Sequence, residues 1–172
     1  MQKSKIFKLI PVKHEIESVM DKIASLLRSL KFTDYSIQTQ TMIIRQLLKN
    51  GIKYSNFAAS ETEFTIGIHI TDKTITFEVM NPVDPKSSDS LRELDKTIQF
   101  IQGYQDPFEA FIIKQKEAVK NTYQTESDDL ENARVAYKGN VTLDFIVGEN
   151  NTLIQSAVKK LEGNRCLAHS IR

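Results

Sequence analysis

The spacing of hydrophobic residues changes once along this chain, and that change most constrains the fold. From about residue 13 to residue 54, apolar side chains recur at the three-to-four-residue period of an amphipathic helix. From residue 64 to residue 80, apolar and polar residues alternate, as in a strand with one buried face. Helices followed by such strands predict a sheet with helices packed on one face.

The helical part divides into two helices after an opening strand. We expect a strand at Ile6–Ile10 and a first helix from about Lys13 to Lys31. The second helix can be capped by Asp34 or Ser36, and its apolar stripe continues to about Tyr54.

Two hairpins follow from the alternating stretches. The first joins residues 64–70 to residues 75–80 through a short turn at Asp72 and Lys73. The second pairs residues 141–147 with residues 153–158. Its turn contains two consecutive asparagines, a residue type that tolerates positive φ.

The chain between the hairpins is predicted to be a loop and three helices. The stretch Asn81–Ser90 is rich in Pro, Ser and Asp and predicts a long loop. Ser90 and Glu93 then form a capping box for a helix. Two further helices are expected, one starting at Asp106 and Pro107 and one near Asp129–Tyr137.

These elements predict the α+β class: a two-layer α/β sandwich with one mixed or antiparallel sheet and helices on a single face. A doubly wound parallel sheet fits poorly, because its strands would be apolar on both faces and its glycine-rich turn is missing. With 172 residues, one domain is expected, covering residues 1–161 and followed by a polar tail at 162–172.

Composition excludes several classes of function. Lys and Arg number 23 against 22 Asp and Glu, so we expect no general attraction to nucleic acid. A lone Cys166 and three scattered histidines, His14, His69 and His169, predict no metal site. The N-terminal sequence has the pattern of neither a signal peptide nor a membrane span, so a cytoplasmic protein without membrane contact is expected.

The segment QLLKNGIKYS, from Gln46 to Ser55, resembles the N-box of the GHKL superfamily. This is the ATP-binding fold shared by sensor histidine kinases and anti-sigma-factor serine kinases. The order of predicted elements is also similar to that family, which places a strand and a helix before the N-box helix and a hairpin after it. The resemblance covers about residues 1–160 and implies a sandwich of the Bergerat type.

The resemblance implies roles for four residues. Gln46, Asn50 and Lys53 are spaced to project from one side of their helix. In the family, the residue matched by Asn50 coordinates Mg²⁺, and Gln46 stands at the position of a carboxylate general base, although an amide cannot accept a proton. Asn81 stands where an Asp binds adenine, or it only bonds its own backbone. The resemblance implies that these four form a vestigial or alternative site for ATP and Mg²⁺. We expect Gln46 and Asn50 to line a shallow concavity between their helix and the sheet, partly filled by side chains of residues 81–85.

The segment Asp128–Tyr137 looks like the family's phosphate loop and following helix, with Asp129 and Glu131 in place of two glycines. Carboxylates there would repel a triphosphate by about one to several kcal/mol each. The alternative interpretation is that these acidic residues are ordinary charges at a helix N-terminus.

The sequence therefore predicts a non-catalytic regulatory protein, with no catalytic residue and no cofactor, that acts by binding another protein in bacterial signalling. The resemblance implies a sigma-like factor, an antagonist domain or a signalling kinase as partner, and a homodimer is a further alternative. The rival hypothesis is an active ATP-dependent serine/threonine kinase of the anti-sigma-factor type, using ATP and Mg²⁺. A third is an unrelated α+β interaction domain.

Overall fold

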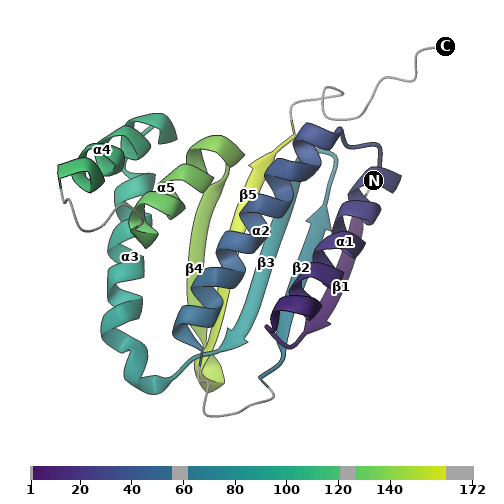
Figure 1. The fold of residues 1–172 in the computed structure, drawn as a ribbon, viewed down its shortest axis with the longest axis horizontal. Coiled ribbons are helices and arrows are strands. Elements are labelled where there is room, and N and C mark those ends of the chain that lie inside the picture. Colours follow the sequence, from purple (N-terminus) through teal and green to yellow (C-terminus); the bar gives the residue numbers. More distant parts are fainter. Residues whose placement is uncertain (1, 56–61, 121–126, 162–172) are drawn as a thin grey trace.

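The computed structural model describes residues 2–55, 62–120 and 127–161. In this part of the chain, five strands and five helices form two layers (Figure 1). In chain order the elements are β1 (Lys3–Leu9), α1 (Lys13–Ser29), α2 (Asp34–Tyr54), β2 (Phe64–Ile70), β3 (Thr74–Pro82), η1 (Pro85–Ser87), α3 (Ser88–Gln102), α4 (Pro107–Lys120), α5 (Asp128–Gly139), β4 (Thr142–Gly148), η2 (Glu149–Asn151) and β5 (Thr152–Lys160).

The strands form one open sheet in the order β1-β2-β3-β5-β4, and every pair is antiparallel. In β2 and β3 the alternating pattern places the apolar side chains on the helix-covered face, where Ile68 and Phe77 are buried opposite one another. The predicted two-layer α+β sandwich is therefore confirmed, and of the two predicted sheet types the structure has the antiparallel one.

All five helices belong to one side of the sheet (Figure 1). Helix α1 lies over β1 and β2, and α2 lies over β3 and β5. Helix α5 lies beside α2, α3 flanks β4, and α4 packs on α5. The fully buried side chains of Ile43, Ile44 and Leu48 place α2 at the centre of the core. Packing of this stripe, rather than intrinsic helix propensity, is what stabilises a helix of this length.

The expected caps of α2 are wrong. Neither Asp34 nor Ser36 caps the helix, because both lie inside its first turn. Thr33 is the N-cap, and its hydroxyl accepts a hydrogen bond from the Ser36 backbone N–H at 3.2 Å. The opening strand also differs, since β1 begins at Lys3 and ends at Leu9, three residues and one residue earlier than predicted.

The predicted loop at Asn81–Ser90 and the capping box of Ser90 and Glu93 are wrong as well. Strand β3 continues to Pro82, and η1 leads directly into α3, which begins at Ser88. The Asp84 side chain accepts a hydrogen bond from the Lys86 N–H at 2.9 Å and so caps this short helix. Helical structure has therefore already begun before Ser90, which leaves that residue no capping role.

Both predicted hairpins are confirmed. In the turn between β4 and β5, Asn150 and Asn151 adopt φ of 64° and 53°, the left-handed region that asparagine tolerates. The predicted start of α4 is also confirmed, because the Asp106 carboxylate accepts a hydrogen bond from the Phe108 N–H at 2.9 Å. The predicted tail at 162–172, with Cys166 and His169, lies outside the described residues.

Among the described residues, no helix combines the length and the apolarity needed to cross a lipid bilayer.

The close approach of α2 to β3 depends on Gly51. A Cβ atom at this position would lie 2.7 Å from Oδ1 of Asn81 and 3.0 Å from Cε2 of Phe64, and both side chains are buried. We predict that Gly51→Ala lowers the free energy of unfolding by about 1–3 kcal/mol, because overpacking outweighs the gain of about 1 kcal/mol in helix propensity. Urea unfolding measures this change.

The matched control for that substitution is Gly148→Ala. A Cβ atom at Gly148 would meet its nearest neighbour, the Thr152 carbonyl oxygen, at 3.7 Å, which is ordinary contact. The control is expected to change stability by less than about 0.5 kcal/mol. A Gly51→Ala variant as stable as the control would contradict the close approach.

Candidate functional site

The site residues on α2 face α5. Gln46, Asn50 and Lys53 lie on one side of α2, as their spacing predicts, and all three form hydrogen bonds with side chains of α5. Helix α5 comes close to α2 because it presents small residues: Ala133 and Ala136 are fully buried, and a Cβ atom at Gly139 would lie 3.0 Å from Ile43.

Three amide side chains form a buried cluster between the two helices, which we call the amide cluster. Nε2 of Gln46 donates to Oδ1 of Asn50 at 3.2 Å and to Oδ1 of Asn132 at 3.1 Å. Nδ2 of Asn50 donates to the same Asn132 oxygen at 3.0 Å. The three residues are 6%, 3% and 2% exposed, so these bonds replace contacts with water that the groups have lost.

The amide cluster changes what Asn50 can do. The oxygen that the resemblance assigns to Mg²⁺, Oδ1 of Asn50, accepts a hydrogen bond from Gln46 instead. Both helices would have to separate before this oxygen met an ion, because the residue is buried between them. The arrangement thus favours a structural role for the amides.

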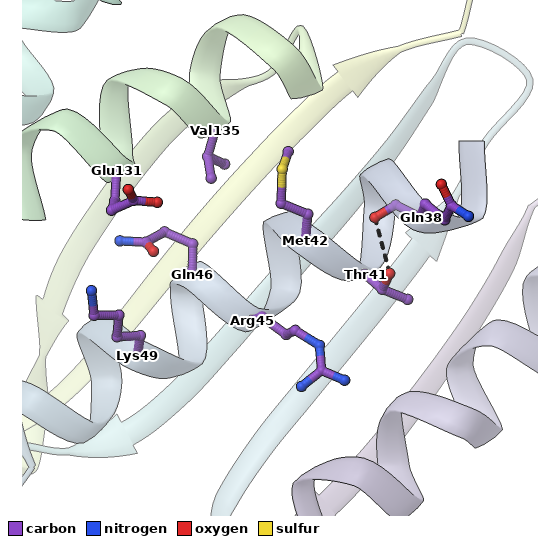
Figure 2. Close-up of a pocket in the computed structure, with 8 residues that line it drawn as sticks. All are labelled: Gln38, Thr41, Met42, Arg45, Gln46, Lys49, Glu131 and Val135. Carbon is purple, nitrogen blue, oxygen red and sulfur yellow. Dashed lines mark hydrogen bonds between the residues drawn. The ribbon is translucent and has the colours of Figure 1, made fainter. Parts of the chain in front are cut away.

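An open hollow of about 420 Å³ lies between α2 and α5, with Gln46 of the amide cluster among its lining residues (Figure 2). Gln46 points into it from α2 and Glu131 from α5, while Met42 and Val135 form its apolar part. The lining residues are Gln38, Thr41, Met42, Arg45, Gln46, Lys49, Glu131 and Val135.

The expected concavity is correct only in part. Gln46 lines a hollow, as expected, but this hollow lies between α2 and α5 rather than between α2 and the sheet. Asn50 does not line it, and neither does any of residues 81–84. The reason is that α5 packs directly on this side of α2 and covers Asn50.

Asp128 joins the first turn of α5 to the C-terminal part of α2. Its carboxylate accepts a hydrogen bond from Nζ of Lys53 at 2.5 Å and lies 3.4 Å from Nζ of Lys49. Burial favours a higher pKa for Asp128, but the hydrogen bonds and charges of both lysines outweigh it and hold that pKa below its usual value. The same hydrogen bond raises the pKa of Lys53, against the opposing effect of burial.

The segment that looked like a phosphate loop is the first turn of α5. Ser127 caps this helix, its hydroxyl accepting a hydrogen bond from the Leu130 N–H at 3.2 Å. Asp129 accepts hydrogen bonds from Thr97 at 2.6 Å and Lys114 at 3.4 Å, and Glu131 pairs with Arg134 at 2.6 Å. The alternative interpretation, acidic charge at a helix N-terminus, describes these residues.

Asn81 lies on β3, apart from the other three predicted site residues, and contacts the C-terminal end of α2. Its Nδ2 donates to the Gly51 carbonyl at 3.2 Å and to the neighbouring Pro82 carbonyl at 3.0 Å. Gly51 is among the last four residues of α2, whose carbonyls lack partners within the helix. Asn81 therefore tethers the end of α2 to β3, and it also bonds its own backbone, as the alternative proposed.

Sequence reasoning did not single out Asn132, which accepts two of the three hydrogen bonds in the amide cluster. Its partners lie 86 and 82 residues away in sequence. The available signal was weak: a polar residue next to the apolar positions Leu130 and Ala133 of a short helix.

No protein-family model matches this chain, and a search of the curated proteins finds no match either. The chemistry of the site therefore has to be argued from its own residues.

Removing the shared acceptor of the amide cluster tests its structural role. Asn132→Ala leaves the donors of Gln46 and Asn50 buried without this partner, and each such group costs about 1–3 kcal/mol. We predict that the variant lowers the free energy of unfolding by at least about 2 kcal/mol, measured by urea unfolding.

The control for that variant is Gln99→Ala on α3, which removes an exposed side-chain amide whose partner within residues 2–55, 62–120 and 127–161 is Asp95. It is expected to cost less than about 0.5 kcal/mol. If the two substitutions lowered the free energy of unfolding equally, the amide cluster would contribute no more to stability than an exposed amide does.

The contacts of Asp128 predict a pH dependence of stability. Because its folded-state pKa lies below the unfolded value, the stabilisation is complete above about pH 4 and is lost as the pH falls through the folded-state pKa. Asp128→Asn should therefore lower stability by about 0.5–1 kcal/mol at pH 7, and the difference from the natural chain should vanish in acid.

Thermal unfolding of the two proteins between pH 2 and pH 7 measures this difference. Asp95→Asn is the control, since Asp95 forms no ion pair with the described residues. A difference for Asp128→Asn that stays constant across this pH range would contradict the ion pair.

Proposed function

We propose that this chain is a non-catalytic regulatory protein with a degenerate GHKL-type fold, acting in the bacterial cytoplasm by binding another protein. The observation that carries the proposal is the amide cluster, which joins α2 to α5 across the side of α2 where the resemblance implies a nucleotide pocket. A regulator of this kind works through its surface rather than through chemistry.

The order of the elements supports the family part of the proposal. The resemblance implies a strand and a helix before the N-box helix, a hairpin after it, and a phosphate loop with its helix just before a later strand. The chain has β1 and α1 before α2, the β2–β3 hairpin after it, and then three helices before β4 and β5. Fold alone does not assign an activity, so the site has to carry the functional argument.

Three features of the site argue against ATP chemistry. Gln46 cannot accept a proton, so it cannot act as a general base. Oδ1 of Asn50 is engaged within the amide cluster. The Asp128 carboxylate already lies beside Lys49 and Lys53 at the N-terminus of α5, which is where the resemblance would bring a phosphate. An incoming triphosphate would have to displace this carboxylate or be repelled by it.

Family analogy supplies the class of partner. A sigma-like factor, an antagonist domain of a partner-switching system and a signalling kinase are the partners we propose, and a homodimer is the alternative. None of them requires a cofactor.

The rival function is an active ATP-dependent serine/threonine kinase. The observation in its favour is the cationic pair Lys49 and Lys53 beside the N-terminus of α5, since such a position suits an anion.

Calorimetry with Mg-ATP distinguishes the two functions. We predict no dissociation constant below about 100 μM, the value equivalent to about −5.5 kcal/mol. Thermal unfolding with millimolar Mg-ATP is likewise expected to show no stabilisation, whereas a ligand at a hundred times its dissociation constant would add about 2.7 kcal/mol. Tighter binding, or phosphorylation of a co-purified protein, would overturn the proposal in favour of the kinase.

Asp128→Ala is the companion variant for this titration. If the carboxylate occupies an anion position, its removal frees Lys49 and Lys53, and any weak affinity for Mg-ATP should increase. Asp95→Ala, on α3, removes the same charge away from the lysine pair and controls for a general change of charge.

A further inference from the structure

A second hollow adjoins the one that Gln46 lines. It measures about 610 Å³ and is lined by Tyr35, Gln38, Thr39, Met42, Tyr137 and Lys138. Gln38 and Met42 line both hollows, so the two lie side by side along α2. Together they form one groove between α2 and α5, which we call the α2–α5 groove.

Aromatic side chains gather at one end of the α2–α5 groove. Tyr35 is 78% exposed, although it is a large side chain with apolar surface. Tyr137 packs against Phe108 and Phe111 of α4, with ring centroids 4.9 and 5.5 Å apart, and Phe108 is itself 41% exposed. Exposed aromatic groups that adjoin a groove are typical of protein-binding surfaces.

The walls of the α2–α5 groove determine the form of its occupant. Both walls are helices, whose backbone N–H and C=O groups bond within the helix, so an extended peptide would find no strand edge to pair with. A segment that binds in the groove therefore has to form its backbone hydrogen bonds internally, as a helix does. The groove follows α2 from Tyr35 to Lys49, about 21 Å, the length of roughly four helical turns.

The charges on the α2–α5 groove determine the character of that helix. Its lining contains three cations, Arg45, Lys49 and Lys138, and one anion, Glu131. Arg45 is paired with Glu17 and Glu131 with Arg134, so these charges are balanced. Lys49 shares the Asp128 carboxylate with Lys53, which leaves one positive charge there, and Lys138 forms no ion pair with the described residues. A partner with carboxylates beside its apolar stripe complements this excess of positive charge.

We propose that the α2–α5 groove binds an acidic amphipathic helix of a partner protein. Apolar residues of that helix pack on Met42 and on the ring of Tyr137, and its carboxylates lie near Lys138 and Lys49. This inference rests on the proposed function, because it names the surface and the partner chemistry through which a regulatory protein of this fold would act.

A pair of designed peptides tests the inference on the full chain. Both are fluorescent and roughly 18 residues long, with Leu at helical spacing; one carries Glu at its polar positions and its twin carries Lys. We expect the acidic peptide to bind with a micromolar dissociation constant, at least about tenfold tighter than its basic twin, and more weakly at high salt.

Two variants locate the binding. Met42→Glu places a carboxylate in the groove and should weaken binding of the acidic peptide at least about tenfold. Lys138→Glu reverses an exposed charge, and about threefold weakening is expected, so the test survives if Met42→Glu fails to fold. Lys73→Glu, an equal charge reversal at another exposed lysine, should change binding less than about twofold.

The inference is overturned if the acidic peptide does not bind, if both peptides bind equally, or if neither groove variant weakens binding. Self-association of the chain that Met42→Glu abolishes would also overturn it, by showing that a second copy fills the groove. Repeating the titration with Mg-ATP separates the two proposals. Tight binding of Mg-ATP would refute the proposal that this chain lacks ATP chemistry. The proposal that the α2–α5 groove binds an acidic helix is tested by the peptide results alone.

Discussion

The packing of α5 on α2 depends on one buried carboxamide, that of Asn132. Oδ1 of Asn132 accepts hydrogen bonds from both Gln46 and Asn50 and thereby joins α5 to α2 through buried polar contacts. Buried polar groups stabilise a fold only when they are paired, so the position of α5 is specified by geometry as well as by apolar packing. The α2–α5 groove and the contacts of Asp128 both depend on this position.

Amide side chains also fix α2 from the sheet. Nε2 of Gln155 on β5 donates to the Leu47 carbonyl at 3.0 Å, and Nδ2 of Asn81 on β3 donates to the Gly51 carbonyl. The central helix is therefore held from the sheet below and from α5 beside it. For the binding that we propose, a groove on a helix fixed in this way would already be formed before a partner arrives, which would lower the entropic cost of binding.

The sequence predicted the parts of the fold that depend on local pattern. Alternation in residues 64–80 identified the first hairpin, and the asparagine pair at 150 and 151 identified the turn of the second. The sequence did not identify the N-cap of α2, because the side chains of Thr33, Asp34 and Ser36 can all cap a helix. Thr33 is the N-cap because its backbone is extended where the helix begins. Asn132 was missed because its partners are remote in sequence, so no local pattern marks it as buried.

The NH₂ groups of Gln46 and Asn50 are hydrogen-bonded within the amide cluster, and we propose that Mg-ATP does not break these bonds. Nuclear magnetic resonance of the side-chain amide groups tests it most directly. We predict that both NH₂ groups exchange slowly with solvent and that their resonances stay in place when millimolar Mg-ATP is added. Rapid exchange of these groups, or shifts that follow Mg-ATP concentration, would contradict it.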